Sequence, residues 1–345
     1  MSEYAVVENP SVELWNSFLK TFPEGNLGQC FEIGEIEKIA YPRVKIVRLM
    51  ITCNVEPIGI VQGTYSSYFG FGMTLRVMRG PIVNAETKEK LQLLRSLLKE
   101  LEDYSKRKRI IEAQILVPDS RQLQEVLHRM GYAPAGKIEN EYIVNLEEGV
   151  EKLWKSINHN KRRNIKKAEK EKVEIIQSHS HEDLETFLSI YEATVKRKKL
   201  PKYPRSWFDA VWKVYNPELT KVFLANWKGK SVSGVHIVIH GKTVYALSAG
   251  SLPEGWKVRP NDIIHWKVMQ WACQNGYSKY DMGYVPEPLP TKESSDWGIW
   301  RWKREWNGIL QRTQTFDKTF LPRYKLILQA KKLVERGYAG IRRLK

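Results

Sequence analysis

A repeated order of elements is the feature that most constrains how this chain of 345 residues can fold. In the first half, alternating apolar runs over residues 44–77, broken by turn residues, precede a helix, a strand, a second helix and a further strand. The second half repeats this order, with three strands over residues 222–249, a helix over 261–275 and a strand over 280–282. Each half therefore predicts an α+β layer fold, with helices packed on a mainly antiparallel sheet.

The length indicates two domains, because one hydrophobic core rarely serves so many residues. We place the first domain at residues 1–147 and the second at residues 148–318. Residues 319–345 carry apolar side chains at helical spacing with basic side chains around them. We expect this segment to form a helix that docks on the first domain. The alternative is a helix that attaches to an anionic membrane surface.

Positive charge is concentrated in the second half of the chain. Residues 1–150 contain 18 Lys and Arg against 20 Asp and Glu, whereas residues 151–345 contain 38 against 19. A neutral half joined to a strongly cationic half indicates a polyanionic ligand for the second half. Nucleic acid, a nucleotide-linked substrate and an anionic membrane all have the required charge.

The cysteines and histidines predict neither a disulfide framework nor a metal site. Cys30, Cys53 and Cys273 are far apart in the sequence and form no CxxC pair. His236 and His240 share the face of one predicted strand but lie roughly 13 Å apart at the usual strand rise, too far to bind one ion. The polar N-terminal residues lack the pattern of a secretory signal. We therefore expect a cytoplasmic protein, peripheral to the membrane if a surface helix attaches it.

Cationic side chains gather on one face of a helix predicted over residues 151–172. At 100° per residue, Leu153, Ile157 and Ile165 fall on one arc. The opposite arc carries seven cations, at Lys152, Lys155, Arg162, Arg163, Lys166, Lys167 and Lys170. This face either follows the phosphates of a nucleic acid or simply keeps the helix solvated.

A second cluster combines aromatic and basic side chains near the end of the second half. It comprises Trp297, Trp300, Arg301, Trp302, Lys303, Arg304 and Trp306. Such a cluster can stack bases or sugars, or it can be a strand with Trp in the core and cations in water. The sequence contains no GxSxG, HExxH, P-loop or GxGxxG motif in its proper context, so no nucleophile elbow, zinc protease or nucleoside triphosphatase is predicted.

Several segments resemble the FemABX family of non-ribosomal peptidyltransferases, which use aminoacyl-tRNA to extend the peptide stem of cell-wall precursors. The segments are Leu153-Trp154, the KRRNIKKA run at 161–168, the EATVKR run at 192–197, residues 260–276, the YDMG run at 280–283, and Trp302-Lys303. The resemblance implies two acetyltransferase-like (GNAT-like) domains. It is most similar to the compact FemX type, because the chain has no room for a long helical-hairpin arm.

The resemblance also implies roles for individual residues. Trp302-Lys303 corresponds to the family's Phe-Lys pair, with Trp in place of Phe, and Lys303 would neutralise the oxyanion that forms during acyl transfer. Lys38, Thr194 and Arg197 would bind the precursor, with Arg197 gripping its phosphate. Contacts with tRNA would come from Lys155, Arg162, Arg163, Lys166, Lys167 and Lys170. No general base, metal or cofactor is assigned, since aminoacyl-tRNA is itself the acyl donor.

We therefore predict transfer of an amino acid from aminoacyl-tRNA to an amine of a peptide-bearing, nucleotide- or lipid-linked cell-wall precursor. The rival prediction is a GNAT-type enzyme that uses acetyl-CoA to acylate a polysaccharide or a small amine. GNAT enzymes cradle pyrophosphate with backbone N–H groups, but residues 252–260 hold one glycine, a bulky Trp256 and two prolines. This loop favours tRNA over CoA. A third hypothesis is a non-catalytic protein that binds tRNA or a membrane surface.

Overall fold

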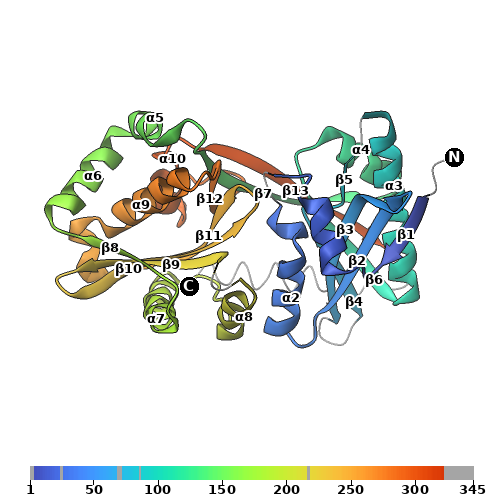
Figure 1. The fold of residues 1–345 in the computed structure, drawn as a ribbon, viewed down its shortest axis with the longest axis horizontal. Helices are drawn as coiled ribbons and strands as arrows, with labels where there is room; N and C mark the ends of the chain where they lie inside the picture. Colours follow the sequence, from blue (N-terminus) through green and yellow to red (C-terminus); the bar gives the residue numbers. More distant parts are fainter. Residues whose placement is uncertain (1–3, 24–25, 68–71, 85–86, 216–217, 322–345) are drawn as a thin grey trace. The chain divides into compact units, whose positions relative to one another are not determined.

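The computed structural model describes residues 4–23, 26–67, 72–84, 87–215 and 218–321 (Figure 1). Contacts divide the described residues into unit 1, within 4–21, 41–137 and 314–321, and unit 2, within 22–40 and 138–313. This division differs from the expected boundary after residue 147, because residues 22–40 and 138–147 pack within unit 2 and residues 314–318 within unit 1.

Unit 1 combines a sheet with three helices among its described residues. Its elements are β1 (Tyr4–Glu8), α1 (Val12–Leu19), β2 (Lys45–Cys53), β3 (Glu56–Ser67), β4 (Met73–Met78), β5 (Ile82–Val83), α3 (Thr87–Arg107), β6 (Ile110–Pro118), α4 (Arg121–Arg129), the start of β7 (Ala133–Asn145) and the end of β13 (Ile309–Thr319). Pairing is antiparallel from β1 to β4, and β4 pairs with β6 in parallel. Apolar side chains of α3 and α4 pack on the sheet to form the core of the unit.

Unit 2 contains the remaining elements. They are η1 (Leu27–Gln29), α2 (Phe31–Ala40), the end of β7, α5 (Gly149–Ser156), α6 (His159–Lys170), β8 (Glu174–Ser178), α7 (His181–Lys198), α8 (Arg205–Tyr215), β9 (Thr220–Trp227), β10 (Lys230–His240), β11 (Thr243–Ser251), η2 (Pro253–Val258), α9 (Pro260–Gln274), β12 (Lys279–Pro286), α10 (Trp297–Arg304) and the start of β13. Figure 1 shows α7 and α8 on one face of the sheet and α5, α6 and α9 on the other.

In the sheet of unit 2, two neighbouring parallel strands separate along their length. Its order is β7-β12-β11-β10-β9-β8, and α9 connects β11 to β12. The parallel pairing joins Thr243–Tyr245 to Lys279–Asp281. Beyond these residues β11 continues along β10 to Ser251, whereas β12 continues along β7 to Pro286. The backbones of β11 and β12 therefore diverge, and each finds its hydrogen-bond partners on its other side.

The predicted fold class is confirmed, since both halves follow the order of three strands, a crossover helix, a parallel strand, a helix and a last strand. The helix expected over residues 151–172 is wrong in one respect, because it is two helices. Ile157 is extended between α5 and α6, and the side-chain oxygen of Asn158 accepts a hydrogen bond from Asn160 N at 2.8 Å, which starts the second helix.

Two further expectations change near the C-terminus. The Trp and Lys cluster at residues 297–304 forms helix α10, so the strand interpretation is wrong. Thr319 is the last residue of strand β13, so no helix begins there, and residues 322–345 lie outside the described part of the chain. Among the described residues, no helix combines the length and the hydropathy needed to cross a membrane.

Candidate functional site

The ammonium group of Lys303 is buried beside the point where β11 and β12 diverge. Lys303 lies in the last turn of α10 and is 7% exposed. Its Nζ donates hydrogen bonds to the backbone oxygens of Gly283 at 3.0 Å and Tyr284 at 2.8 Å, both in β12. A register shift lies between Asp281 and Tyr284, and Gly283 has a φ of +78°, a conformation that glycine adopts without strain. This irregularity in β12 positions both carbonyls for Lys303.

The surroundings of Lys303 bring the pKa of its ammonium group close to physiological pH. Burial lowers the pKa of its ammonium to about 8, and the nearby charge of Asp281 opposes this shift. At neutral pH the group is therefore mostly protonated. A lysine ammonium has three N–H donors, and the two carbonyls accept two of them. The third donor can reach a developing negative charge.

A buried ion pair holds the segment that carries Lys303. Lys161 is fully buried, and its Nζ lies 2.7 Å from Oδ1 of Asp262 in the first turn of α9. The same carboxylate accepts hydrogen bonds from Trp302 Nε1 at 2.7 Å and from Asn164 Nδ2 at 3.0 Å. Lys161 also lies 3.4 Å from Glu305 Oε2 and 4.4 Å from the centre of the Trp302 ring. Trp302, which precedes Lys303, is thus bound to α9, and Glu305, which follows it, is bound to α6.

The histidine nearest to this cluster is a weak base. Burial lowers the pKa of His265 to about 3, with smaller contributions from the charges of Lys161 and Lys303. Its Nδ1 lies 2.7 Å from the hydroxyl of Tyr280. His265 is therefore neutral across the physiological range, and its buried ring lies beside the Tyr280 hydroxyl.

Thr194 and Arg197 lie at the C-terminal end of β11. The hydroxyl of Thr194 lies within hydrogen-bond distance of Ser251 O at 3.1 Å and accepts from Ser251 N at 2.9 Å, which fastens α7 to the strand. Arg197 is half-buried, with its guanidinium carbon 4.9 Å from the centre of the Trp256 ring. The structure therefore leaves Arg197 available to a ligand, whereas the hydroxyl of Thr194 is used within the protein.

Lys38 is exposed near the end of α2, in the segment that packs within unit 2. This helix contacts α8. The binding role expected for Lys38 therefore depends on α2 and α8, whereas the roles of Thr194 and Arg197 depend on α7. Its role in precursor binding stays a prediction.

The predicted tRNA contacts divide into two groups. Arg162 is half-buried, and its Nη1 donates to the backbone oxygens of Trp154, Lys155 and Ile157 at 3.2, 2.9 and 2.7 Å. It therefore closes the C-terminal end of α5. The other cations are exposed, with Lys155 on α5 and a group on α6 that we call the α6 basic face, Arg163, Lys166, Lys167 and Lys170. Their spacing places these four on one arc of the helix.

The loop between β11 and α9 is packed tightly as η2. A Cβ atom added at Gly255 would lie 2.6 Å from Cβ of Val232, and Leu252 N donates to Val232 O at 2.8 Å. The first turn of α9 contains the Asp262 carboxylate, which is paired with Lys161. Because Lys161 and Asp262 offset each other's charge, this pair offers no free cation to a pyrophosphate at the start of the helix. The geometry thus agrees with the expectation that this loop is poorly built for CoA.

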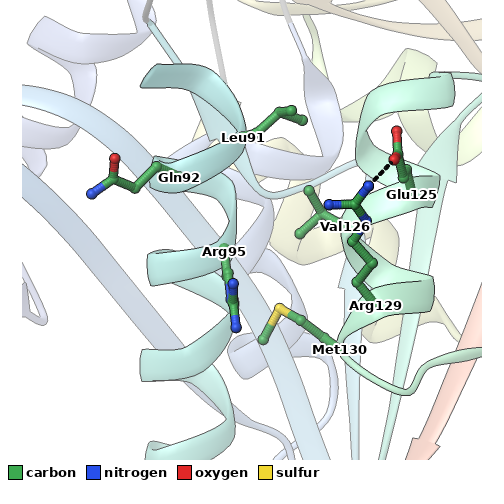
Figure 2. Close-up of a pocket in the computed structure, with 7 residues that line it drawn as sticks. All are labelled: Leu91, Gln92, Arg95, Glu125, Val126, Arg129 and Met130. Carbon is green, nitrogen blue, oxygen red and sulfur yellow. Dashed lines mark hydrogen bonds and ion pairs between the residues drawn. The ribbon is translucent and has the colours of Figure 1, made fainter. Parts of the chain in front are cut away.

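A small pocket in unit 1 is separate from these residues. It lies between α3 and α4 and is lined by Leu91, Gln92, Arg95, Glu125, Val126, Arg129 and Met130 (Figure 2). Its volume of about 190 Å³ is below the usual size of small-molecule sites. An ion pair between Arg129 and Glu125, at 2.5 Å, crosses one side of it. The pocket contains none of the predicted site residues.

Comparisons with known proteins agree on the type of fold. A model of the acetyltransferase (GNAT) domain matches residues 155–304. The chain resembles a crystal structure of FemX, with a TM-score of 0.83, 18% identity, and coverage of 94% of this chain and 99% of that one. A tandem GNAT protein from the clavulanic acid biosynthesis pathway has a TM-score of 0.59 at 8% identity, with coverage of 93% and 99%. The expected GNAT-like fold is confirmed.

Sequence similarity to characterised proteins is partial. The lipid II:glycine glycyltransferase of Staphylococcus saprophyticus is 30% identical over 102 residues, which are 29% of this chain and 24% of that protein. The enzyme of the same name from Staphylococcus aureus strain USA300 is 30% identical over 106 residues, 30% of this chain and 25% of that protein. The matched stretch thus spans about a quarter of these relatives. The chain thus shares the fold of FemX and, over about 30% of its length, sequence similarity with proteins named lipid II:glycine glycyltransferase.

Proposed function

We propose that this protein is an aminoacyltransferase that joins an amino acid from aminoacyl-tRNA to an amine of a peptide-bearing cell-wall precursor. The observation that carries the proposal is the buried ammonium of Lys303, which retains one N–H donor beside the diverging strands β11 and β12. The FemX-like fold and the similarity to proteins named lipid II:glycine glycyltransferase support membership of the FemABX family and a lipid- or nucleotide-linked peptide as the acceptor.

The proposed reaction needs charge stabilisation at one oxygen. The acceptor amine attacks the ester carbonyl of the aminoacyl-tRNA, a C–N bond forms, and negative charge develops on the carbonyl oxygen. Collapse of this intermediate breaks the ester bond, and the proton lost by the amine ends on the ribose hydroxyl of the tRNA. A fixed Lys303 ammonium binds the oxyanion more strongly than the ester, so it lowers the barrier. Removing one such donor typically costs about 3 kcal/mol.

The acceptor would be held by cations around the end of β11. Arg197 is half-buried against Trp256, and its guanidinium can bind phosphate through two parallel hydrogen bonds. Thr194 would act through Ser251, by fixing α7 and the strand on which Arg197 depends. Lys38 would add a second charge for the same ligand.

The donor would be held by the α6 basic face and Lys155. All five side chains are exposed, so they can contact phosphates without the cost of opening buried ion pairs. Arg162 would support this surface by closing α5. Use of aminoacyl-tRNA places the reaction in the cytoplasm, at the membrane surface when the acceptor is lipid-linked.

A second candidate function is CoA-dependent N-acylation of a polysaccharide or a small amine. The match of residues 155–304 to the acetyltransferase (GNAT) domain favours it. The packed η2 loop argues against it.

The deciding experiment offers the protein both donors. In one incubation the protein receives total tRNA charged with labelled amino acids, and in a second it receives acetyl-CoA. Both contain nucleotide-linked and lipid-linked muropeptides as acceptors. Mass spectrometry identifies the products. We expect a product that carries one added aminoacyl residue. This product should not form when the tRNA is deacylated beforehand. An acetylated product from acetyl-CoA would establish the alternative, and tRNA binding without product would indicate a non-catalytic protein.

A further inference from the structure

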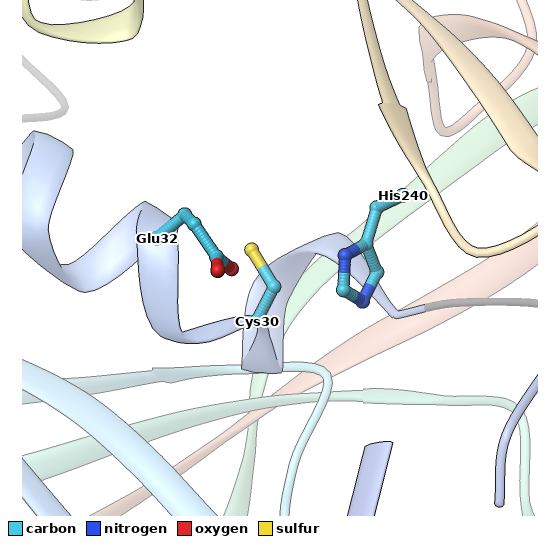
Figure 3. Close-up of side chains that lie close together, drawn as sticks. All are labelled: Cys30, Glu32 and His240. Carbon is cyan, nitrogen blue, oxygen red and sulfur yellow. The ribbon is translucent and has the colours of Figure 1, made fainter. Parts of the chain in front are cut away.

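Three potential metal ligands meet in unit 2, outside the residues discussed above. The Cys30 sulfur, a Glu32 carboxylate oxygen and a His240 ring nitrogen all lie within 4.8 Å of one another (Figure 3). Cys30 follows η1, Glu32 lies in the first turn of α2, and His240 is the last residue of β10. Cys30 is fully buried, and the other two are half-buried.

The fold fixes the positions of all three residues. The segment that carries Cys30 and Glu32 is tied at both ends, since Lys242 N donates to Pro23 O at 2.7 Å and the Ser206 hydroxyl donates to Ala40 O at 3.1 Å. Inside the segment, the Cys30 sulfur lies 3.0 Å from the Tyr215 hydroxyl of α8. His240 stands at the end of a strand that is paired with β11. The cluster thus rests on regular elements.

We propose that Cys30, Glu32 and His240 form a binding site for a divalent transition-metal ion, and that Zn²⁺ is the ion it fits best. Thiolate, carboxylate and imidazole are the ligand types that zinc binds in proteins. One thiolate, one carboxylate and one neutral imidazole together offset the double charge of the ion, which favours binding at a partly buried site. Cys30 gives up its thiol proton to solvent when the metal binds.

The geometry needs little adjustment. Zinc bonds of about 2.0 to 2.3 Å in a tetrahedral arrangement separate neighbouring donor atoms by about 3.5 Å. The three donors already lie within 4.8 Å of one another, so side-chain rotation of about an ångström closes the gap. A water molecule can complete the four-coordinate shell. The Tyr215 hydroxyl can donate to the thiolate and orient it.

Such an ion would fasten α2 to the end of β10. Residues 22–40 are joined by the chain to unit 1 at both ends yet pack within unit 2, so their placement depends on local contacts. A metal ion bound by two residues of this segment and one of the sheet would secure α2, the helix that carries Lys38. The site is thus structural, and its occupancy does not require the proposed transfer reaction.

Cobalt binding to the full-length chain tests the site. Protein stripped with a chelator is titrated with Co²⁺, and the thiolate-to-cobalt charge-transfer band in the near ultraviolet reports ligation by cysteine. We expect the band to saturate at one equivalent and to disappear when Zn²⁺ is added. Cys30→Ser and His240→Gln should abolish the band, and Glu32→Gln should weaken Co²⁺ binding at least tenfold. Cys53→Ser and Cys273→Ser are matched controls that should retain it.

The proposal is overturned if the wild-type chain shows no charge-transfer band, or if His240→Gln binds Co²⁺ as the wild type does. Should Cys30→Ser fail to fold because its sulfur is in the core, His240→Gln decides, since His240 is half-buried at a strand end. The titration contains neither tRNA nor acceptor. Its outcome is therefore independent of whether the chain transfers amino acids.

Discussion

The carboxylate of Asp262 lies 2.7 Å from the ammonium of Lys161, and both side chains are buried. Because the same carboxylate also accepts the indole N–H of Trp302, this ion pair of α6 and α9 binds the residue next to Lys303. Burial lowers the pKa of Lys161, against the opposite effect of Asp262. The pair therefore costs desolvation free energy and in return fixes the direction of α10.

Lys161→Met should destabilise the protein by about 3 to 5 kcal/mol, because it leaves the buried Asp262 carboxylate without its cation. Urea unfolding followed by fluorescence measures the free energy of unfolding. The double variant Lys161→Met with Asp262→Leu removes both charges and should recover much of the loss. A single variant that costs under about 1 kcal/mol would show that the ion pair does not organise this region.

The rate of aminoacyl transfer should fall as pH rises through about 8, because burial lowers the pKa of Lys303 to about 8 and only its charged form stabilises the oxyanion. Single-turnover rates across this range, corrected for hydrolysis of the aminoacyl ester, measure the effect. Lys303→Arg should move the alkaline limb to much higher pH, since a guanidinium stays charged. An alkaline limb that is the same in both proteins would assign it to another group.

Arg162→Ala should lower the free energy of unfolding by about 1 to 3 kcal/mol, since it leaves carbonyls at the end of α5 without their charged donor. The exposed neighbour Arg163 provides the matched control. Arg163→Ala should change stability by less than about 0.5 kcal/mol. Equal effects of the two substitutions in urea unfolding would contradict the capping role of Arg162.

Charge reversal of the α6 basic face should reduce the dependence of tRNA binding on salt. Each phosphate contact contributes about 0.7 to 0.9 to the slope of log K against log salt concentration, so Glu at Arg163, Lys166, Lys167 and Lys170 should lower the slope by about 3. Filter binding over a salt series measures it. Reversal of four exposed cations of unit 1, Lys45, Arg95, Lys99 and Arg121, is the matched control. A slope that falls equally in both variants would remove the α6 basic face as the tRNA surface.

Local signals in the sequence predicted the order of elements and the fold class. Apolar periodicity and turn residues are short-range features, so β2, β3, β9, β10 and β11 and the crossover helix at Thr87–Arg107 could be placed from them, whereas β1 and β13 were missed. The break before Asn158 was missed although asparagine is a good N-cap, because cations continue at helical spacing on both sides of it.

Long-range contacts decided the rest. In the sequence, Lys161 is one of several cations in a basic run. In the structure it is buried and pairs with Asp262, which is 101 positions away. Arg162 belongs to the same run, but its guanidinium donates hydrogen bonds to backbone oxygens at the end of α5. His240 was compared with His236 on its own strand, whereas Cys30 and Glu32 approach it from a distant segment. No spacing in the sequence connects these residues.

The most direct test of the account is the single-turnover rate of aminoacyl transfer by Lys303→Met, measured together with the binding of charged tRNA and of the acceptor. Because Lys303 is held to stabilise the oxyanion and not the bound substrates, the rate should fall about 100-fold to 1000-fold while both affinities stay within a few-fold of wild type. Lys267→Met, on α9, serves as the control and should keep the wild-type rate. A Lys303→Met protein that transfers at the wild-type rate would contradict the central claim.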